Sequence, residues 1–401
     1  MSKENIYEPE WSAIAVEAAS HFGTPIYLFS WDVLLQALRV LKSLERSVPI
    51  RHWLSMKTQP LRRLLQEWRG IGGGIEVVSE FELRAALQEG FLAEQILVNG
   101  VAKHSWLPTV SVRGLRVHFD SVDETYSLAG AASKQAWRVG IRFAVQGQFD
   151  PDEPKFKAQF GMLRNEAQLA VRKLRDAGAA LESAHFHLRS NVRKANEYEM
   201  ALTDLHDACS FADLQPRYVD CGGGLPCPGE DVTAEPFDFQ ELANVLQAGS
   251  RNFRSLEEIW LENGRFLSSR AGVLVLRVLD VKIRPECRYL ICDGGKTNHA
   301  LVSDWERHII SVVPERSGPL QLTTVCGPTC MAFDRLCRLD LPEDVRAGDL
   351  LLWKNAGAYH NPWETRFSYG LAPIAWIDSR GNMDLVRKRE SFANWWSPQR
   401  E

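Results

Sequence analysis

Residues 50–60, IRHWLSMKTQP, form an apolar run, broken by Arg51 and His52, that ends in a turn carrying Lys57. The same unit, a short apolar run followed by an amphipathic stretch, recurs from about residue 25 to residue 265. The other runs are 26–29, 75–78, 95–98, 117–119, 139–143, 185–188 and 218–220. About eight strands in such units indicate a parallel sheet closed into a (β/α)8 barrel of the TIM type more readily than an open sheet. Active groups then follow the carboxyl ends of the strands, where Lys57 lies.

Beyond residue 265 the sequence changes to β-branched runs without long helices. These runs are 272–281, 288–292, 308–313, 320–325, 349–353 and 374–377. They predict a second, all-β domain. The expected domains are an N-terminal segment, 1–24, that joins the β domain, a barrel, 25–265, and a C-terminal β domain, 266–401.

Composition and charge favour a soluble protein that acts on small molecules. The chain has 401 residues, of which 45% are hydrophobic and 24% charged. Its 47 basic and 51 acidic residues are well mixed and give a net charge of −4, so no basic stripe indicates binding to nucleic acid or to a membrane surface. The N-terminus carries acids and lacks the apolar core of a signal peptide, and no window is long enough to span a membrane. We therefore expect a cytoplasmic protein.

The cysteines and histidines do not predict a metal site. The eight cysteines form no CxxC pair, and Cys326 and Cys330 have no nearby histidine or second pair to complete a zinc site. His185 and His187 lie on one face of a strand, but two ligands do not make a metal site, and no carboxylate at matching spacing completes one. We expect reduced thiols, and a packing role for the histidines that could be against a cofactor ring.

Three motifs could carry chemistry. An ε-amine at the mouth of a strand, as at Lys57, can lose solvation and become a nucleophile for an aldehyde, although most such lysines are solvated surface groups. The three glycines 222–224 directly follow a strand, where successive backbone N–H groups can approach a phosphate. A flexible turn is an equally good interpretation, since 72–74 is also a glycine triplet. Glu262 and Arg265 close another strand, where a surface ion pair is the simpler interpretation.

Taken in order, these pieces resemble the fold-type III pyridoxal-phosphate decarboxylases, the family of diaminopimelate and ornithine decarboxylases. The resemblance covers nearly the whole chain. Its segments are 22–27, 56–57, 74–83, 99–103, 185–190, 220–224, 262–265, 292–295, 327–334, 348–350 and 356–359. The family fold, alanine racemase-like, is a TIM-like barrel with a C-terminal β domain.

The resemblance assigns roles that the residues alone leave open. It implies that Lys57 forms a Schiff base with pyridoxal 5′-phosphate (PLP), that His187 stacks on the pyridine ring, and that Glu262 contacts the ring nitrogen. The further residues it implies in cofactor binding are Ser190, Gly222, Gly223, Gly224, Gly264, Arg265 and Tyr359. A carboxylate at the ring nitrogen keeps it protonated, so the ring can accept the electron pair released with CO₂. Alanine racemase has an arginine there, so Glu262 favours decarboxylation over racemisation.

The resemblance also implies a homodimer with shared active sites. In the family, the loop carrying Cys330 enters the site of the neighbouring subunit, where the thiol protonates Cα after CO₂ has left. The cofactor supplies the electron sink by itself, so no metal is implied.

Three departures concern the substrate. Met331 stands where family members have a glutamate or aspartate that reads a distal amine, and segment 296–301, KTNHAL, lacks the arginine of diaminopimelate decarboxylases. Arg189 replaces the usual glycine and adds a positive group near the cofactor. A distal ammonium left unpaired in a closed site costs several kcal/mol, so a bare distal amine is disfavoured. The residues expected to meet the distal group are Arg189, Asp293, Met331 and Asp334, with Lys296, His299 and Arg335 as further cations.

These departures favour a carboxylate-rich or conjugated amino acid of siderophore or other secondary metabolism. Diaminopimelate, the substrate in lysine biosynthesis, is the second candidate, since Asp293 is an acid near the distal end. An amino-acid racemase on the same fold and a non-catalytic regulator of the antizyme-inhibitor kind are competing hypotheses for the function. Lys57, Glu262 and Cys330, retained together with the triple glycine, argue against the regulator.

Overall fold

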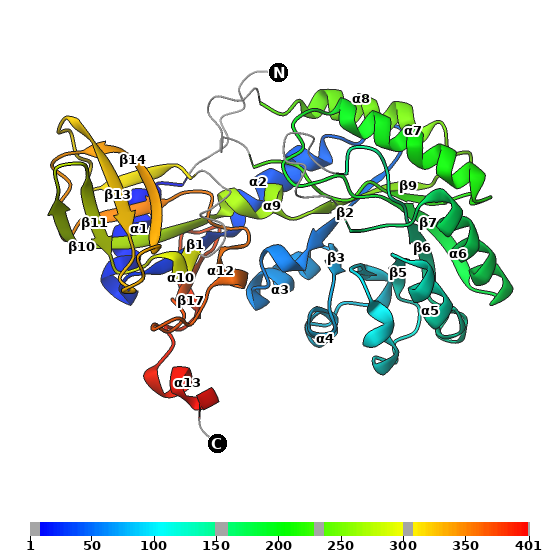
Figure 1. The fold of residues 1–401 in the computed structure, drawn as a ribbon, viewed down its shortest axis with the longest axis horizontal. Coiled ribbons are helices and arrows are strands. Elements are labelled where there is room, and N and C mark those ends of the chain that lie inside the picture. The colour runs from blue at the N-terminus through cyan, green and yellow to red at the C-terminus, as the bar shows by residue number, and fades with distance from the viewer. Residues whose placement is uncertain (1–8, 149–158, 228–235, 300–307, 400–401) are drawn as a thin grey trace. The chain divides into compact units, whose positions relative to one another are not determined.

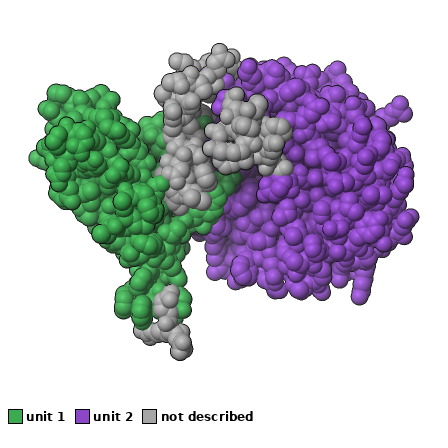
Figure 2. All heavy atoms as spheres, viewed as in Figure 1, with its two compact units in different colours: residues 1–37, 227–234, 267–401 green, residues 38–226, 235–266 purple. Residues whose placement is uncertain are grey.

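The computed structural model describes residues 9–148, 159–227, 236–299 and 308–399. The chain divides into two compact units (Figure 2). One comprises Leu38–Pro226 and Glu235–Phe266 and is called the barrel unit here. The second comprises Met1–Ala37, Cys227–Ala234 and Leu267–Glu401 and is called the sheet unit.

Eight parallel strands among the described residues close the barrel, which confirms the expected TIM-like architecture. They are β2 (Ile50–Ser55), β3 (Gly74–Val77), β4 (Ile96–Val98), β5 (Arg116–Phe119), β6 (Arg138–Arg142), β7 (Ala180–His185), β8 (Tyr218–Asp220) and β9 (Glu258–Asn263). Pairing of β2 with β9, in the register Ile50 opposite Ile259, closes the ring. Parallel strands covered on both faces read as near-continuous apolar runs, as β3 and β4 do.

Helices follow the barrel strands and lie on the outside of the ring (Figure 1). They are α3 (Arg62–Gly70), α4 (Glu80–Gln88), α5 (Val122–Lys134), α6 (Arg164–Asp176), α7 (Asn196–Phe211) and α8 (Phe239–Ser250). In α6 the buried residues Ala167, Ala170, Val171 and Leu174 recur at helical spacing and form the face that covers the strands. Ser79 and Ser121 cap α4 and α5 by accepting backbone N–H bonds, so each helix begins where its strand has ended.

The sheet unit is built on a nine-stranded sheet, which confirms the expected second β domain. Its strands are β1 (Ile26–Ser30), β10 (Gly272–Ile283), β11 (Arg288–Cys292), β12 (Ile310–Val313), β13 (Leu320–Cys326), β14 (Arg335–Pro342), β15 (Leu350–Trp353), β16 (Ile374–Ile377) and β17 (Met383–Arg387). The order is β14-β13-β11-β10-β1-β16-β17, with β15 pairing both β10 and β12. The described helices outside the barrel ring are α1 (Trp11–Phe22), α2 (Trp31–Lys42), α9 (Arg265–Ser268), α10 (Lys296–His299), α12 (His360–Trp363) and α13 (Phe392–Trp396).

One strand expected in the barrel lies in the sheet unit. β1 pairs antiparallel with β10 and parallel with β16, and β9 takes the eighth place in the barrel. All five residues of β1 are buried, as in a barrel strand, so its apolar run predicts burial but not which sheet it joins.

The expected domain boundaries stay a proposal. The compact units differ from them by taking β1 and the start of α2 into the sheet unit. The first eight residues of the expected N-terminal segment lie outside the described residues. None of the helices in the described ranges combines the length and the apolar character needed to cross a membrane.

Candidate active site

Lys57 lies directly beyond the carboxyl end of β2, in a short 3-10 turn, Met56–Thr58. Its Nζ is 3.2 Å from both carboxylate oxygens of Glu76 on β3, and Glu76 is buried. Ser55 donates a hydrogen bond to the same carboxylate. The lysine side chain is 40% exposed, so its amine is held at the strand end while remaining open to a ligand.

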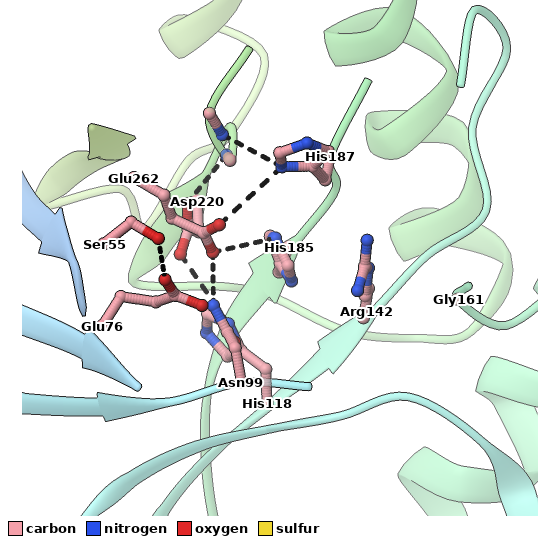
Figure 3. A network of polar contacts seen from close by, with 12 residues as sticks. Ser55, Glu76, Asn99, His118, Arg142, Gly161, His185, His187, Asp220 and Glu262 are labelled. Atoms are coloured by element: carbon pink, nitrogen blue, oxygen red, sulfur yellow. Dashed lines mark hydrogen bonds and ion pairs between the residues drawn. The ribbon is translucent and has the colours of Figure 1, made fainter. Parts of the chain in front are cut away.

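Every barrel strand brings a polar side chain to the same end of the ring. In strand order from β2 to β9 they are Ser55, Glu76, Asn99, His118, Arg142, His185, Asp220 and Glu262. Figure 3 shows most of them pointing toward one another, with Glu262 at the centre of the contacts. The carboxyl ends of parallel strands meet at one edge, so these residues, scattered over 200 positions, form one site.

Glu262 makes the central contacts. His185 Nε2 lies 3.1 Å from Glu262 Oε1, and His187 Nδ1 lies 3.8 Å from Oε2. Asn99 donates its side-chain amide to Oε1. On the neighbouring strand, Asp220 Oδ1 accepts the Gly222 N–H at 2.8 Å. The two carboxylates therefore have different partners.

These partners separate the protonation states of the two acids. Burial and the nearby charge of Glu262 raise the pKa of Asp220 well above its ordinary value. Burial also acts to raise the pKa of Glu262, but His185, His187 and Lys57 together hold it well below its ordinary value. Burial lowers the pKa of His185 to about 4. Burial and the Glu262 charge therefore favour the protonated form of Asp220, whereas Glu262 stays ionised beside the neutral imidazole of His185.

His185 ends β7 and His187 lies beyond it, so, contrary to expectation, the two do not share a strand face. Carboxylates do come close to His185, although none has a matching spacing in the sequence. Ligand atoms of His118, His185, Asp220 and Glu262 lie within 4.8 Å of one another. The spacing of these residues along the chain did not predict the cluster, because its four members come from four different strands. Within the protein, Asn99, His185 and His187 contact the Glu262 carboxylate.

The glycines after β8 approach their neighbours too closely for a side chain. A Cβ on Gly222 would lie 2.6 Å from the Phe186 carbonyl oxygen, and one on Gly223 would lie 2.5 Å from that of Glu262. Gly224 has φ +101°, and a Cβ there would be 2.2 Å from the Arg189 carbonyl oxygen. The Gly223 N–H points to His187 Nδ1 at 3.1 Å. The triplet is therefore a backbone wall beside Glu262 and His187 rather than a loose turn.

Arg265 and Gly264 continue the same region, at the end of β9 and the start of α9. A Cβ on Gly264 would be 2.3 Å from Thr58 Cγ2, which places this backbone against the turn that carries Lys57. Ser190 is exposed in the loop after β7.

Arg189 is engaged by the protein itself. Its Nη2 is 2.6 Å from Glu197 Oε2, and its Nη1 donates to the Gly147 carbonyl at 3.1 Å. Both side chains of the ion pair are largely buried. The positive charge expected near the distal end of the substrate is therefore already compensated.

The remaining predicted residues, Asp293, Cys330, Met331, Asp334 and Tyr359, belong to the sheet unit. Cys330 is exposed. Asp334 accepts the backbone N–H groups of Thr329 at 3.0 Å and Lys296 at 2.7 Å, and Asp293 accepts that of Arg277 at 2.8 Å. Both acids thus brace backbone segments. Of the KTNHAL segment, Ala300 and Leu301 lie outside the described residues.

Sequence reasoning did not single out Glu76, Asn99 or His118 for roles in the site. A usable signal was present: Glu76 is the one polar side chain of its strand, and His118 lies between Val117 and Phe119, in strands that are fully buried. A buried charge or imidazole in such a strand requires partners, so its presence indicates a polar site on that face.

The fold and site define a barrel enzyme with a lysine, an ionised buried carboxylate and a glycine wall at the carboxyl ends of its strands. The family described as pyridoxal-dependent decarboxylase, pyridoxal binding domain, matches residues 33–269, more than half of the chain. The chain belongs to this family. It is a PLP-dependent carboxy-lyase acting on an amino acid.

Its relatives include the diaminopimelate decarboxylase of Aquifex aeolicus, which is 27% identical over 398 residues, covering 94% of this chain and 91% of the relative. The L-glutamyl-[BtrI acyl-carrier protein] decarboxylase of Niallia circulans is 28% identical over 398 residues, covering 92% of each protein. The crystal structure of diaminopimelate decarboxylase from M. jannaschii matches with a TM-score of 0.85 at 20% identity, over 96% of this chain and 94% of that one. This last likeness supports the fold.

Proposed function

We propose that Lys57, Glu262 and the glycine triplet hold PLP at the carboxyl ends of the barrel strands for α-decarboxylation of an amino acid. The observation that carries the proposal is the buried Glu262 carboxylate, kept ionised and flanked by His187 and the Gly223 backbone. An ionised carboxylate is the partner that a protonated pyridine nitrogen requires. The donor set therefore fits the cofactor.

When bound, PLP supplies an electron sink for the pair released as CO₂ leaves. Glu262 holds a proton at the ring nitrogen. Gly222 to Gly224 are the backbone segment that we propose for the phosphate, and the Arg265 guanidinium is suited to a dianion. Glu76 holds the Lys57 amine at the strand end. From there the amine can donate or accept a proton at the substrate Cα.

Diaminopimelate is the first substrate that we propose. Support comes from the relatives of this name and from the compensation of Arg189 by Glu197, which removes the residue that most favoured a carboxylate-rich distal group. The second candidate is an amino acid conjugated through its side-chain carboxylate, of a siderophore or other secondary pathway. Met331, the missing arginine in KTNHAL and the Niallia circulans relative favour it.

The test is CO₂ release by the purified holoenzyme from diaminopimelate, ornithine, glutamate and a glutamyl thioester. We expect kcat/KM to be highest for diaminopimelate. Preference for the thioester or glutamate by roughly 10-fold or more, about 1.4 kcal/mol, would replace it with the second candidate.

The Arg189→Ala variant tests the distal contact directly, with the exposed Arg193→Ala as its control. We expect lowered stability and an unchanged KM, because Arg189 is bound by Glu197. A KM raised by about 10- to 150-fold, the range for a lost charged hydrogen bond, would return Arg189 to the substrate site.

We also propose a homodimer in the cytoplasm. Exposed Cys330 and Phe333, which is 65% exposed, lie in one loop that a neighbouring subunit could receive. All eight cysteines are free thiols, as in a reducing compartment.

A further inference from the structure

Three histidines meet in the sheet unit. One of them, His299, is expected from the sequence to be a cation near the substrate, but it is fully buried and its pKa is lowered well below its ordinary value. His299 ends α10, His308 precedes β12, and His360 begins α12. One ring nitrogen of each histidine lies within 4.8 Å of a ring nitrogen of each of the other two. The ring centroids are 4.5 Å apart for His299 and His360, 4.6 Å for His299 and His308, and 5.0 Å for His308 and His360. Segments distant in sequence thus bring three imidazoles to one point.

Hydrogen bonds orient two of the rings. His360 Nδ1 lies 2.8 Å from the Ala358 carbonyl oxygen, and His308 Nδ1 lies 2.9 Å from that of Lys354. A carbonyl only accepts, so each Nδ1 carries the proton and donates it. The tautomer then leaves a lone pair on Nε2, the arrangement of histidines that ligate metals.

His299 supplies the strongest indication of a missing ligand. It is fully buried, and neither of its ring nitrogens has a hydrogen-bond partner in the part of the chain that the structure describes. Leaving one buried polar group unsatisfied costs about 1–3 kcal/mol. Packing alone, against Trp353 at 4.8 Å between centroids, satisfies neither nitrogen.

The protonation state of His299 suits a metal ligand. Burial above all, with a smaller effect of the Lys296 charge, lowers the pKa of His299 well below its ordinary value. The imidazole is therefore neutral at physiological pH, which is the form that binds metal ions.

We propose that His299, His308 and His360 bind one divalent transition-metal ion, zinc by preference, with solvent in the open coordination position. Three neutral imidazoles suit zinc, cobalt, nickel and copper better than magnesium or calcium. Zinc bonds of about 2.0–2.1 Å place tetrahedral ligand atoms about 3.4 Å apart, so the rings must close by about 1 Å. The ion would tie α10, the start of β12 and α12 together and fix the segment that carries Tyr359.

The test uses the purified holoenzyme, treated with chelator, dialysed, and titrated with zinc or cobalt. We expect one ion per chain by mass spectrometry of the metal content, visible bands of tetrahedral cobalt, and a higher Tm with zinc. In His299→Leu, which fills the buried site with an apolar side chain, affinity should fall roughly 100-fold or more and the Tm shift should disappear. The half-buried His308→Gln variant should do the same if the leucine variant fails to fold.

His206→Gln, outside the cluster, is the matched control and should bind as the unaltered protein does. Equal binding by all variants would mean that the metal binds elsewhere, for example at the barrel cluster, and would overturn the proposal. So would a protein that takes up less than about a tenth of an ion per chain at micromolar zinc, since zinc sites of this kind bind far more tightly. All these readouts are independent of decarboxylation.

Discussion

Glu262, the residue that we propose contacts the ring nitrogen of the cofactor, has its charge fixed by its neighbours. Asn99 and His185 direct polar atoms at its carboxylate, while burial and the charge of Glu262 raise the pKa of the adjacent Asp220. Lys57 is paired with Glu76 at 3.2 Å. The different surroundings of Asp220 and Glu262 thus shift the pKa values of these two acids in opposite directions.

Lys57→Ala should reduce turnover by roughly 10²–10⁴-fold or more, because the amine that bonds the cofactor and moves protons is lost. The measurements are CO₂ release and the visible absorbance band of the lysine-bound cofactor, which should disappear. Circular dichroism must show a folded protein, since the change leaves Glu76 buried without its cation. The exposed Lys134→Ala is the control, and near-normal activity of Lys57→Ala would contradict the assignment.

At the residue scale the sequence predicted part of this site. Lys57, Glu262 and the glycines could be placed at strand ends, which converge, whereas their roles were implied only by the family resemblance. That Arg189 pairs with Glu197, and that Asp334 braces the loop of Cys330, could not be predicted. These contacts depend on side-chain directions that residue spacing does not contain.

Among the elements, the turn after β8 is tightly constrained. Gly223 faces the Glu262 backbone, and the wall formed by 222–224 exists because three successive residues lack a Cβ. A chain that approaches a ligand through backbone N–H groups needs this geometry.

Gly223→Ala should weaken PLP binding by roughly 10-fold or more, because its Cβ would meet the Glu262 carbonyl oxygen at 2.5 Å and the wall must shift by overpacking, at about 1–3 kcal/mol. Titration of the apoenzyme with PLP measures this. In Gly130→Ala, within α5, the new Cβ meets nothing within 4 Å. This control should keep its PLP affinity and gain about 0.5–1 kcal/mol in the free energy of unfolding. Unchanged PLP affinity in Gly223→Ala would remove the wall from the cofactor site.

Element types followed from the sequence better than element partners did. Periodicity predicted most strands of both units, since apolar runs must be buried wherever they lie. It missed β14 and β17, and the expected strand 185–188 begins where β7 ends. It could not tell that β1 joins β10 and β16 while β9 completes the barrel, because buried strands of either sheet look alike.

In the whole molecule, the residues proposed to act in the site belong to two different units. Lys57 and Glu262 lie in the barrel unit, whereas Cys330 and Tyr359 lie in the sheet unit. If Cys330 serves a neighbouring subunit, as proposed, each active site needs two chains.

Mixing inactive Lys57→Ala and Cys330→Ala chains should then restore activity. With random exchange, half of the dimers are mixed and one of their two sites is intact, so about a quarter of all sites recover. Activity is followed after subunit exchange has been verified with differently tagged chains. No recovery under proven exchange would mean that each site takes both residues from one chain.

The position of β1 has a consequence for synthesis on the ribosome. β1 is a central strand of the second sheet, yet its partner β10 begins only at Gly272. At about 5–20 residues per second, the roughly 240 intervening residues take on the order of 10–50 s to emerge. During that interval the barrel can fold, while Tyr27, Leu28 and Phe29 have no sheet to enter. A nascent chain of this protein therefore carries an unpaired apolar strand that chaperones must shield until the second half has been made.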